Sequence, residues 1–241
     1  VIVDGQGVTS LSPFPREGRK ACVFEEIYFS RPNSVTFGRS VYEQRYTMGR
    51  ALAKVEPVEA DVVVAVPDSG TSAALGYANA AEIPFQQGLI RSHYVGRTFI
   101  EPSQRIRDFG VKLKLSPVKR VLEGKRVVVV DDSLVRGTTS RKIVRMLRTS
   151  GAAEVHVRIC SPPIQGSCFY GVDTPTQEEL IAHRMNIEGI RDYLGANSLA
   201  YLPLDSLRAG LGEEAGRFCD ACFSLDYPVD VQPKDLPQLG L

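Results

Sequence analysis

The sequence lacks tryptophan, contains only three histidines and three methionines, and has no long uninterrupted apolar run. Because a membrane-spanning helix needs roughly 18 or more consecutive apolar residues, no transmembrane segment is expected, and no signal peptide is evident. Charge of one sign is also lacking, since 29 Lys and Arg residues oppose 28 Asp and Glu residues. This balance argues against a general nucleic-acid or membrane-surface binder.

Cysteine is sparse and odd in number, with five residues in 241. An odd count fits a reducing, cytosolic setting better than a disulfide scaffold. We therefore expect a cytoplasmic protein. With 43% hydrophobic and 24% charged residues, the chain is long enough for one sizeable globular core.

The most informative stretch is a run of apolar residues followed by two acids and a hydroxyl-rich turn. Val127 to Val130 are four consecutive β-branched residues, which is typical of a strand buried on both faces. Asp131 and Asp132 follow directly, and residues 140–149 have the apolar spacing of an amphipathic helix. The acids are therefore predicted at the carboxyl end of a strand, where open α/β sheets bind ligands.

The turn has the chemistry of a sugar-phosphate site. Loop amides and the hydroxyls of Thr138, Thr139 and Ser140 can bind a phosphate at the positive end of a helix, and Gly137 allows close approach. The paired acids would repel each other unless a cationic or hydroxyl-rich group lay between them. A ribose diol with Mg²⁺ meets both needs. The alternative is a solvated turn that happens to carry two acids.

A second strand–loop–helix unit precedes this one. Residues 61–66 are a buried-strand candidate, Pro67 to Ser72 form a loop with an acid, hydroxyls and a glycine, and residues 73–81 form a small-residue helix. Taken alone, Asp68-Ser-Gly would more simply be a helix N-cap and turn.

The remaining segments complete the predicted fold. Strands are expected at 21–29, 85–89 and 155–159, and helices at 42–55, 177–183, 187–194 and 206–211. Alternating strands and helices from residue 61 to 159 predict an α/β fold with a parallel sheet of four to five strands and helices on both faces.

These motifs resemble the signature of type I phosphoribosyltransferases, which bind 5-phosphoribosyl-1-pyrophosphate (PRPP). More closely, the chain resembles the C-terminal phosphoribosyltransferase domain of the amidophosphoribosyltransferase (glutamine PRPP amidotransferase) family. The resemblance rests also on Cys22-Val-Phe-Glu-Glu-Ile-Tyr-Phe, Val66-Pro-Asp-Ser-Gly-Thr, Tyr94-Val-Gly-Arg, Ser161-Pro-Pro-Ile and Cys168-Phe-Tyr-Gly-Val-Asp. It implies the type I phosphoribosyltransferase fold with an irregular, partly helical C-terminal extension.

The resemblance also implies a division of the chain and an activity. Residues 1–19 would be the remnant of a missing N-terminal glutaminase domain of the Ntn type plus a linker, residues 20–228 the phosphoribosyltransferase domain, and residues 229–241 a tail. The activity would transfer the phosphoribosyl group of PRPP to ammonia, derived from glutamine in the full-length enzyme. It would yield 5-phosphoribosylamine and pyrophosphate, the first step of de novo purine biosynthesis. Purine nucleotide inhibitors and a homotetramer are implied as well.

The resemblance further assigns roles to individual residues. Asp68, Ser69 and Gly70 would face the pyrophosphate. Asp131 and Asp132 would hold the ribose hydroxyls and Mg²⁺, with Ser69 beside the ion. The remaining PRPP-binding residues would be Ser133, Arg136, Gly137, Thr138, Thr139 and Ser140.

Residues 91–119 are basic, with scattered glycine and proline. They are either a solvated loop or edge hairpin, or a lid that neutralises pyrophosphate and excludes water from the reaction. The resemblance places the flexible catalytic loop here, with Tyr94, Arg97 and Lys112 or Lys114 as candidate catalytic residues.

Cys219-Asp-Ala-Cys222 could by itself be half a zinc site, a redox pair or two cluster ligands. The resemblance selects Cys22, Cys168, Cys219 and Cys222 as ligands of a structural 4Fe-4S cluster, which some family members hold. Free thiols and zinc are the alternatives. Cys160 is predicted to be a buried core thiol.

Two rival functions use the same PRPP loop. A base-salvage phosphoribosyltransferase would need a purine or pyrimidine pocket, and the Cys-x-x-Cys pair and Phe169-Tyr-Gly-Val-Asp argue against it. A non-catalytic PRPP or nucleotide sensor would usually add a DNA-binding element, and no basic recognition helix is evident.

Overall fold

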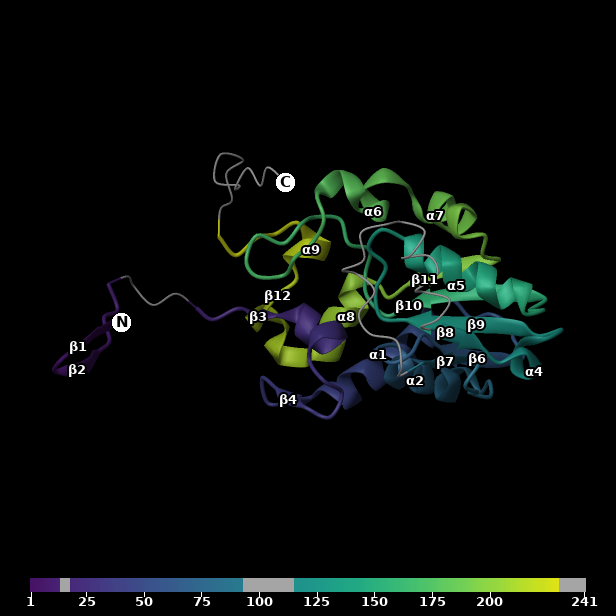
Figure 1. Cartoon of the computed structure of the whole chain (residues 1–241), viewed down its shortest axis with the longest axis horizontal. Helices are drawn as coiled ribbons and strands as arrows, with labels where there is room; N and C mark the ends of the chain where they lie inside the picture. Colours follow the sequence, from purple (N-terminus) through teal and green to yellow (C-terminus); the bar gives the residue numbers. More distant parts are fainter. Residues whose placement is uncertain (14–17, 93–114, 230–241) are drawn as a thin grey trace.

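A computed structural model describes residues 1–13, 18–92 and 115–229. Its centre is a parallel sheet of four strands in the order β11-β10-β9-β6, visible in Figure 1. The strands are β6 (Val62–Ala65), β9 (Arg126–Asp131), β10 (Glu154–Ile159) and β11 (Ser198–Tyr201). The α/β class and the predicted parallel sheet of four to five strands are confirmed.

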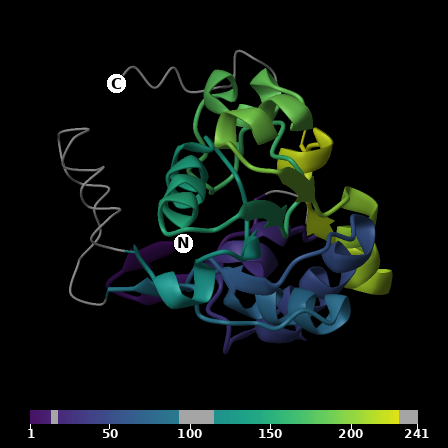
Figure 2. The ribbon, with the colours of Figure 1, turned by 90° about the vertical axis from the view of Figure 1, so that its right-hand side faces the viewer.

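Helices cover both faces of the sheet, as predicted. α1 (Val41–Val55) and α2 (Thr71–Ala81) lie below it, and α5 (Thr138–Thr149) and α7 (Ile187–Leu194) lie above it in Figures 1 and 2. Strand side chains alternate between two buried clusters. Val128 and Val130 face the α1/α2 side, whereas Val127 and Val129 face the α5/α7 side. The continuous valine run therefore reflects burial on both faces.

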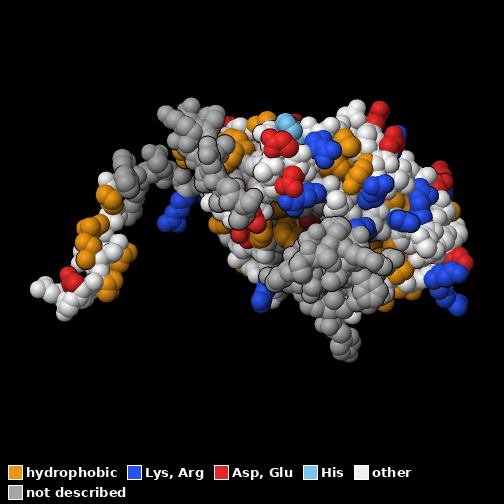
Figure 3. Space-filling view, turned by 45° about the horizontal axis from the view of Figure 1, so that its top comes forward, with side chains coloured by type: hydrophobic (Ala, Val, Ile, Leu, Met, Phe, Trp, Pro, Cys, Tyr) orange, Lys and Arg blue, Asp and Glu red, His pale blue; other side chains and the backbone are white. Residues whose placement is uncertain are grey.

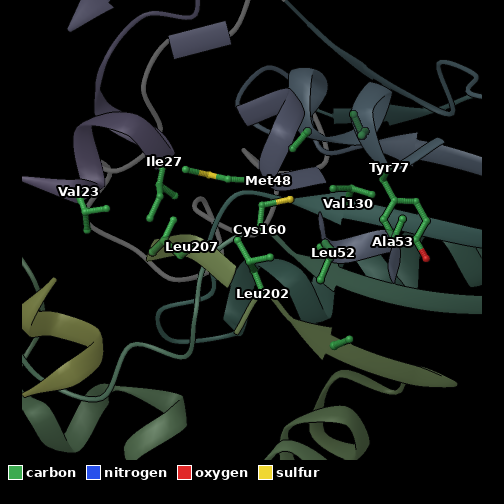
Figure 4. Close-up of a cluster of buried hydrophobic side chains, with 14 of the residues drawn as sticks. Val23, Ile27, Met48, Leu52, Ala53, Tyr77, Val130, Cys160, Leu202 and Leu207 are labelled. Atoms are coloured by element: carbon green, nitrogen blue, oxygen red, sulfur yellow. The ribbon is translucent and has the colours of Figure 1, made fainter. Parts of the chain in front are cut away.

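Figure 4 shows the cluster between the sheet and α1, where Met48, Leu52, Val130 and Leu202 surround Cys160. Cys160 is 3% exposed, so the predicted core thiol is confirmed. Burial raises the pKa of this thiol well above its usual range. It is consequently a small apolar residue of the core rather than a reactive group.

The N-terminal part of the domain differs from prediction. Instead of a strand over residues 21–29, the chain forms a short strand, β3 (Ala21–Cys22), and a π-helix (Glu25–Phe29). β3 pairs only with β12 (Phe218–Cys219). Buried Arg45 of α1 donates to the main-chain oxygens of Glu25, Glu26 and Ser30. This tertiary partner of the carbonyls outweighs the β propensity of the local sequence.

Other local differences are smaller. Residues 85–89 contribute one isolated bridge, between Val63 and Phe85, and the strand begins later, as β7 (Leu89–Arg91), paired antiparallel with β8 (Leu115–Pro117). Residues 177–183 divide into a 3₁₀-helix (Gln177–Glu179) and α6 (Ile181–Arg184). The predicted helix at 206–211 is α8 (Leu204–Leu211). β11 was not predicted.

The remaining elements are short. They are the hairpin β1 (Ile2–Asp4) and β2 (Gly7–Thr9), the ribbon β4 (Val35–Thr36) and β5 (Arg39–Ser40), α4 (Lys119–Leu122), a 3₁₀-helix (Gly212–Arg217) and α9 (Ala221–Ser224). Within the described ranges, no helix is long and apolar enough to cross a membrane. Figure 3 shows basic and acidic side chains interspersed over the face it presents.

Candidate functional site

The paired acids lie where the central strand of the sheet ends. β9 pairs with both β6 and β10, and its four valines are at most 2% exposed. Asp131 is the last residue of β9, and Asp132, 7% exposed, follows it. The chain then crosses a short loop to Gly137, whose φ of 75° lies in the left-handed region, and α5 begins at Thr138. This is the predicted strand–loop–helix arrangement.

The loop after β6 lies beside the loop after β9. Val66 donates its main-chain N–H to Val130 O at 2.9 Å, which extends the pairing of β6 and β9 up to the acids. The β6 loop continues through Pro67 to Gly70 and enters α2 at Thr71. The peptide between Pro67 and Asp68 is cis. Because parallel strands end at the same edge of a sheet, both predicted substrate loops are side by side.

Gly70 and Ser69 contact the loop after β9. A Cβ on Gly70 would lie 2.6 Å from Val130 O and 3.3 Å from Asp131 Cα, so only glycine fits without displacing main chain. The Ser69 side chain hydrogen-bonds to Asp132. The structure thus brings together Ser69, Asp131 and Asp132, the three residues predicted to surround Mg²⁺.

The two carboxyl groups perturb each other. Burial, and then the neighbouring charge of Asp132, raise the pKa of Asp131 well above its usual range. Burial also raises the pKa of Asp132, although hydrogen bonds from Ser133 and Ser69 oppose the rise. A site that disfavours two adjacent negative charges gains stability when a cation or hydroxyl-bearing ligand shares them.

Arg45 is a charged neighbour that the sequence analysis missed. The residue is 3% exposed, and its positive charge opposes the rise in the pKa of Asp132. It belongs to α1, far from the motif in sequence, and has no recognisable pattern of its own. Only the packing of α1 under the sheet brings it near the acids.

The hydroxyls of the predicted phosphate loop (residues 136–140) differ in their exposure. Thr138 and Thr139 are exposed at the start of α5, whereas Ser140 is buried. Ser140 helps to line a cavity of about 10 Å³ beneath the loop, together with Asp131 and apolar residues. We therefore expect the two threonine hydroxyls and the loop amides, rather than the Ser140 hydroxyl, to face a phosphate.

Arg136 and Asp68 are both exposed and already ion-paired. Arg136 pairs with Glu179, and Asp68 pairs with Arg91 of β7. Neither Glu179 nor Arg91 was predicted as a site residue. The candidate catalytic residues Tyr94, Arg97, Lys112 and Lys114 lie outside the described residues.

Four of the five cysteines lie near one another around β3, β12 and α9. Cys22 and Cys219 are directly paired positions of β3 and β12. After burial, the charges of Cys22, Cys168 and Cys219 further raise the pKa of Cys222, so all four thiols are near one another. All are free thiols. Among the described residues, however, no three His, Cys, Asp or Glu side chains form a group that could hold a metal ion.

A parallel sheet with a hydroxyl-rich loop and paired acids at its carboxyl edge is the arrangement expected of a phosphoribosyltransferase site. Residues 51–161 match the model of the phosphoribosyl transferase domain family, and the fold is that of the type I phosphoribosyltransferases. Comparison with individual proteins gives a narrower match. Along its whole length, this chain is 64% identical to the chloroplastic amidophosphoribosyltransferase of Glycine max, of which it spans 42%.

Other relatives agree. The amidophosphoribosyltransferase of Synechocystis is 54% identical over 88% of this chain, which spans 43% of that protein. The structure of glutamine PRPP amidotransferase from B. subtilis, solved with ADP and GMP, matches 97% of this chain with a TM-score of 0.84 and 50% identity, and this chain covers 52% of it. The resemblance to the phosphoribosyltransferase domain of amidophosphoribosyltransferases is confirmed. The chain spans about half the length of these relatives.

The predicted cytoplasmic location is wrong. The relatives from Glycine max and Arabidopsis thaliana, at 64% and 65% identity, are chloroplastic proteins. Unpaired thiols indicate a reducing environment. They do not distinguish one reducing compartment from another.

Proposed function

We propose that this chain transfers the phosphoribosyl group of PRPP to ammonia, yielding 5-phosphoribosylamine and pyrophosphate. In the full-length enzyme the ammonia would come from glutamine, and the reaction would open de novo purine biosynthesis. The observation that carries the proposal is the meeting of Ser69, Asp131 and Asp132 at the edge of the sheet, between two loops that precede helices.

Each loop would hold one part of PRPP. Asp131 and Asp132 accept hydrogen bonds from the ribose hydroxyls, and the segment from Arg136 to Ser140 binds the 5-phosphate. Asp68, Ser69 and Gly70 face the pyrophosphate. Ser133, which donates a hydrogen bond to Asp132, keeps that carboxylate oriented. Catalysis would come mainly from positioning ammonia and PRPP and from neutralising the leaving group.

The donor set fits Mg²⁺. Mg²⁺ commonly binds one or two carboxylates together with substrate oxygens and water, and two carboxylates and a serine hydroxyl are available here. When bound, the ion would supply positive charge to the pyrophosphate leaving group. Tyr94, Arg97 and Lys112 remain proposed lid residues.

The test is pyrophosphate release from PRPP with Mg²⁺ and ammonium chloride, compared with adenine, guanine or no acceptor. We expect pyrophosphate release when ammonium is the acceptor, and none with adenine, guanine or no acceptor. Release only with a base would instead identify a salvage enzyme, and PRPP binding without turnover would identify a sensor. Asp132→Asn should reduce kcat/KM by about 100-fold or more, because it removes a charge that acts in the transition state.

We also propose that Cys22, Cys168, Cys219 and Cys222 hold a 4Fe-4S cluster with a structural role. Four thiols are the chemical donor set of such a cluster. The described side chains do not form a metal-binding group as they stand, but Cys22, Cys168 and Cys219 are close enough to Cys222 for their charges to raise its pKa, and the main-chain N–H of Tyr170 donates to Cys168 Sγ at 3.4 Å. The check is iron content and visible absorption of protein purified without oxygen. Zinc without iron, or four titratable thiols without metal, would contradict the proposal.

The relatives support one further proposal, inhibition by purine nucleotides, and the family resemblance implies another, the homotetramer. The B. subtilis enzyme was solved with ADP and GMP, and another match at 50% identity, which this chain covers to 51%, is described as the allosteric regulatory enzyme of purine biosynthesis. We infer inhibition by purine nucleotides and assembly as a homotetramer, to be tested by nucleotide titration of turnover and by analytical ultracentrifugation. Residues 1–19 are proposed as the end of a glutaminase domain and linker, residues 20–228 as the phosphoribosyltransferase domain and residues 229–241 as a tail.

A further inference from the structure

One short segment, residues 177–184, contacts the phosphate loop at several points. Arg136 donates from Nε and Nη2 to the two carboxylate oxygens of Glu179, at 3.3 and 3.1 Å. The main-chain N–H of Ile181 donates to Val135 O at 3.0 Å. The segment is therefore attached to the loop through the main chain of Val135 and through the side chain of Arg136.

The Ile181 side chain also leaves too little space for a side chain at Gly137. A Cβ on Gly137 would lie 2.6 Å from Ile181 Cδ1 and 3.3 Å from Tyr193 Cε1. Gly137 is the residue that turns the chain into α5, and its amide is one of the donors expected at a phosphate. Any change in the segment that moves α6 therefore changes the geometry of the turn.

The ion pair between Arg136 and Glu179 affects the orientation of the Arg136 side chain more than the stability of the fold. The side chains are 51% and 50% exposed, and exposed ion pairs contribute little to stability. Two parallel hydrogen bonds nevertheless fix the orientation of a guanidinium, since they match its planar fork. The hydrogen bonds from Arg136, and then its charge, lower the pKa of Glu179 below its ordinary value, so the pair is ionised at neutral pH.

We propose that Glu179 is a positioning residue for the 5-phosphate subsite, holding Arg136 and the turn beside it in the conformation that binds the phosphate of PRPP. The inference rests on the proposed function. It extends that function by adding a residue outside the motif, one that acts through Arg136 and does not touch the substrate.

The proposal predicts whether removing the Glu179 carboxylate raises or lowers the KM for PRPP. A carboxylate near a phosphate dianion would weaken binding if it acted only by repulsion, and its removal would then lower the KM for PRPP. If Glu179 positions Arg136, its removal raises KM and leaves kcat nearly unchanged, because uniform binding is lost.

The experiment measures pyrophosphate release with ammonium as acceptor for Glu179→Gln, Glu179→Asp and the control Glu178→Gln. Glu178 is a matched control, because it has the same charge on the same 3₁₀-helix while its hydrogen bonds are to its own backbone and to Thr176. We expect Glu179→Gln to raise the KM for PRPP roughly two- to fivefold. Glu179→Asp, which keeps the charge but shortens the reach, should also raise KM, and Glu178→Gln should not.

A double substitution tests whether the effect passes through Arg136. In an Arg136→Met background, Glu179→Gln should produce no further increase in KM. A lowered KM in Glu179→Gln, a KM equal to that of Glu178→Gln, or an undiminished effect in the Arg136→Met background would overturn the inference. If the unsubstituted protein released no pyrophosphate with ammonium, the proposed function itself would fail instead.

Discussion

Gly70 lies where the loop after β6 packs against the loop after β9. Substituting alanine would place a methyl group 2.6 Å from Val130 O and 3.0 Å from Val66 O, and these main-chain atoms would have to move. We expect Gly70→Ala to cost about 1–3 kcal/mol of unfolding free energy and to lower kcat/KM for PRPP by moving Ser69 away from Asp132. Denaturant unfolding and steady-state kinetics measure the two effects.

Gly210 provides the matched control for that substitution. It lies in α8, and a Cβ there would meet no atom within 4 Å. Gly210→Ala should therefore leave turnover unchanged and stabilise the protein slightly. Equal behaviour of the two alanine variants would contradict the close approach of the loops.

His156 makes the stability of the sheet depend on pH. Its side chain is buried in β10 between Ser198 and Glu154, and burial lowers its pKa from 6.5. The unfolded chain then binds a proton more readily than the folded one, so stability is present above pH 6.5 and falls as the pH drops below it. We expect His156→Gln to flatten the pH dependence of the free energy of unfolding between about pH 5 and 7. A slope unchanged by the substitution would exclude His156 as its source.

At the scale of elements, Arg45 joins α1 to the π-helix. It donates to three main-chain oxygens while nearly fully buried. Arg45→Met should destabilise the domain by about 2–4 kcal/mol, since it removes a donor from three main-chain oxygens, among them that of the buried Glu26. Arg50→Met, at an exposed position of the same helix, should change stability by less than about 0.5 kcal/mol. Urea unfolding of both variants gives the comparison.

The elements differ in how far local sequence determines them. β9 and α5 were predictable because a buried strand, a turn and an amphipathic helix each have a local pattern, and α1 and α2 were predictable for the same reason. The π-helix and β11 were not. The π-helix depends on a guanidinium supplied by another element, and the apolar run of β11 follows a region of short helices, which hides its role as an edge strand.

The residues of the candidate site also divide into those that local sequence predicts and those that only tertiary packing brings into place. Asp131, Asp132 and the β6 loop could be placed together from sequence because parallel strands align their carboxyl ends. Arg45, Arg91 and Glu179 could not, since each belongs to a separate element that only tertiary packing brings near. The predicted cluster cysteines came from family resemblance, and no local pattern indicates that Cys22 and Cys168 lie near the Cys-x-x-Cys pair.

At the scale of the whole molecule, a set of four neighbouring cysteines connects the beginning of the domain with its end. If Cys22, Cys168, Cys219 and Cys222 hold a cluster, binding it stabilises only the folded chain. Cys222→Ser should then abolish iron incorporation and lower the melting temperature of protein prepared without oxygen. Cys160→Ser, which affects a thiol in a different part of the core, should retain iron. A Cys222→Ser protein with full iron content would contradict the ligand assignment.

The hairpin of β1 and β2 extends away from the body in Figure 1, and its apolar residues Val1, Ile2, Val3 and Val8 are 49–85% exposed. A two-stranded ribbon with unpaired edges readily accepts a further strand from a neighbour. Concentrated solutions of this polypeptide should therefore self-associate through the ribbon, and light scattering should report an apparent mass that rises with concentration. Removing residues 1–11 should abolish that rise while the melting temperature stays the same, because no core side chain belongs to the ribbon.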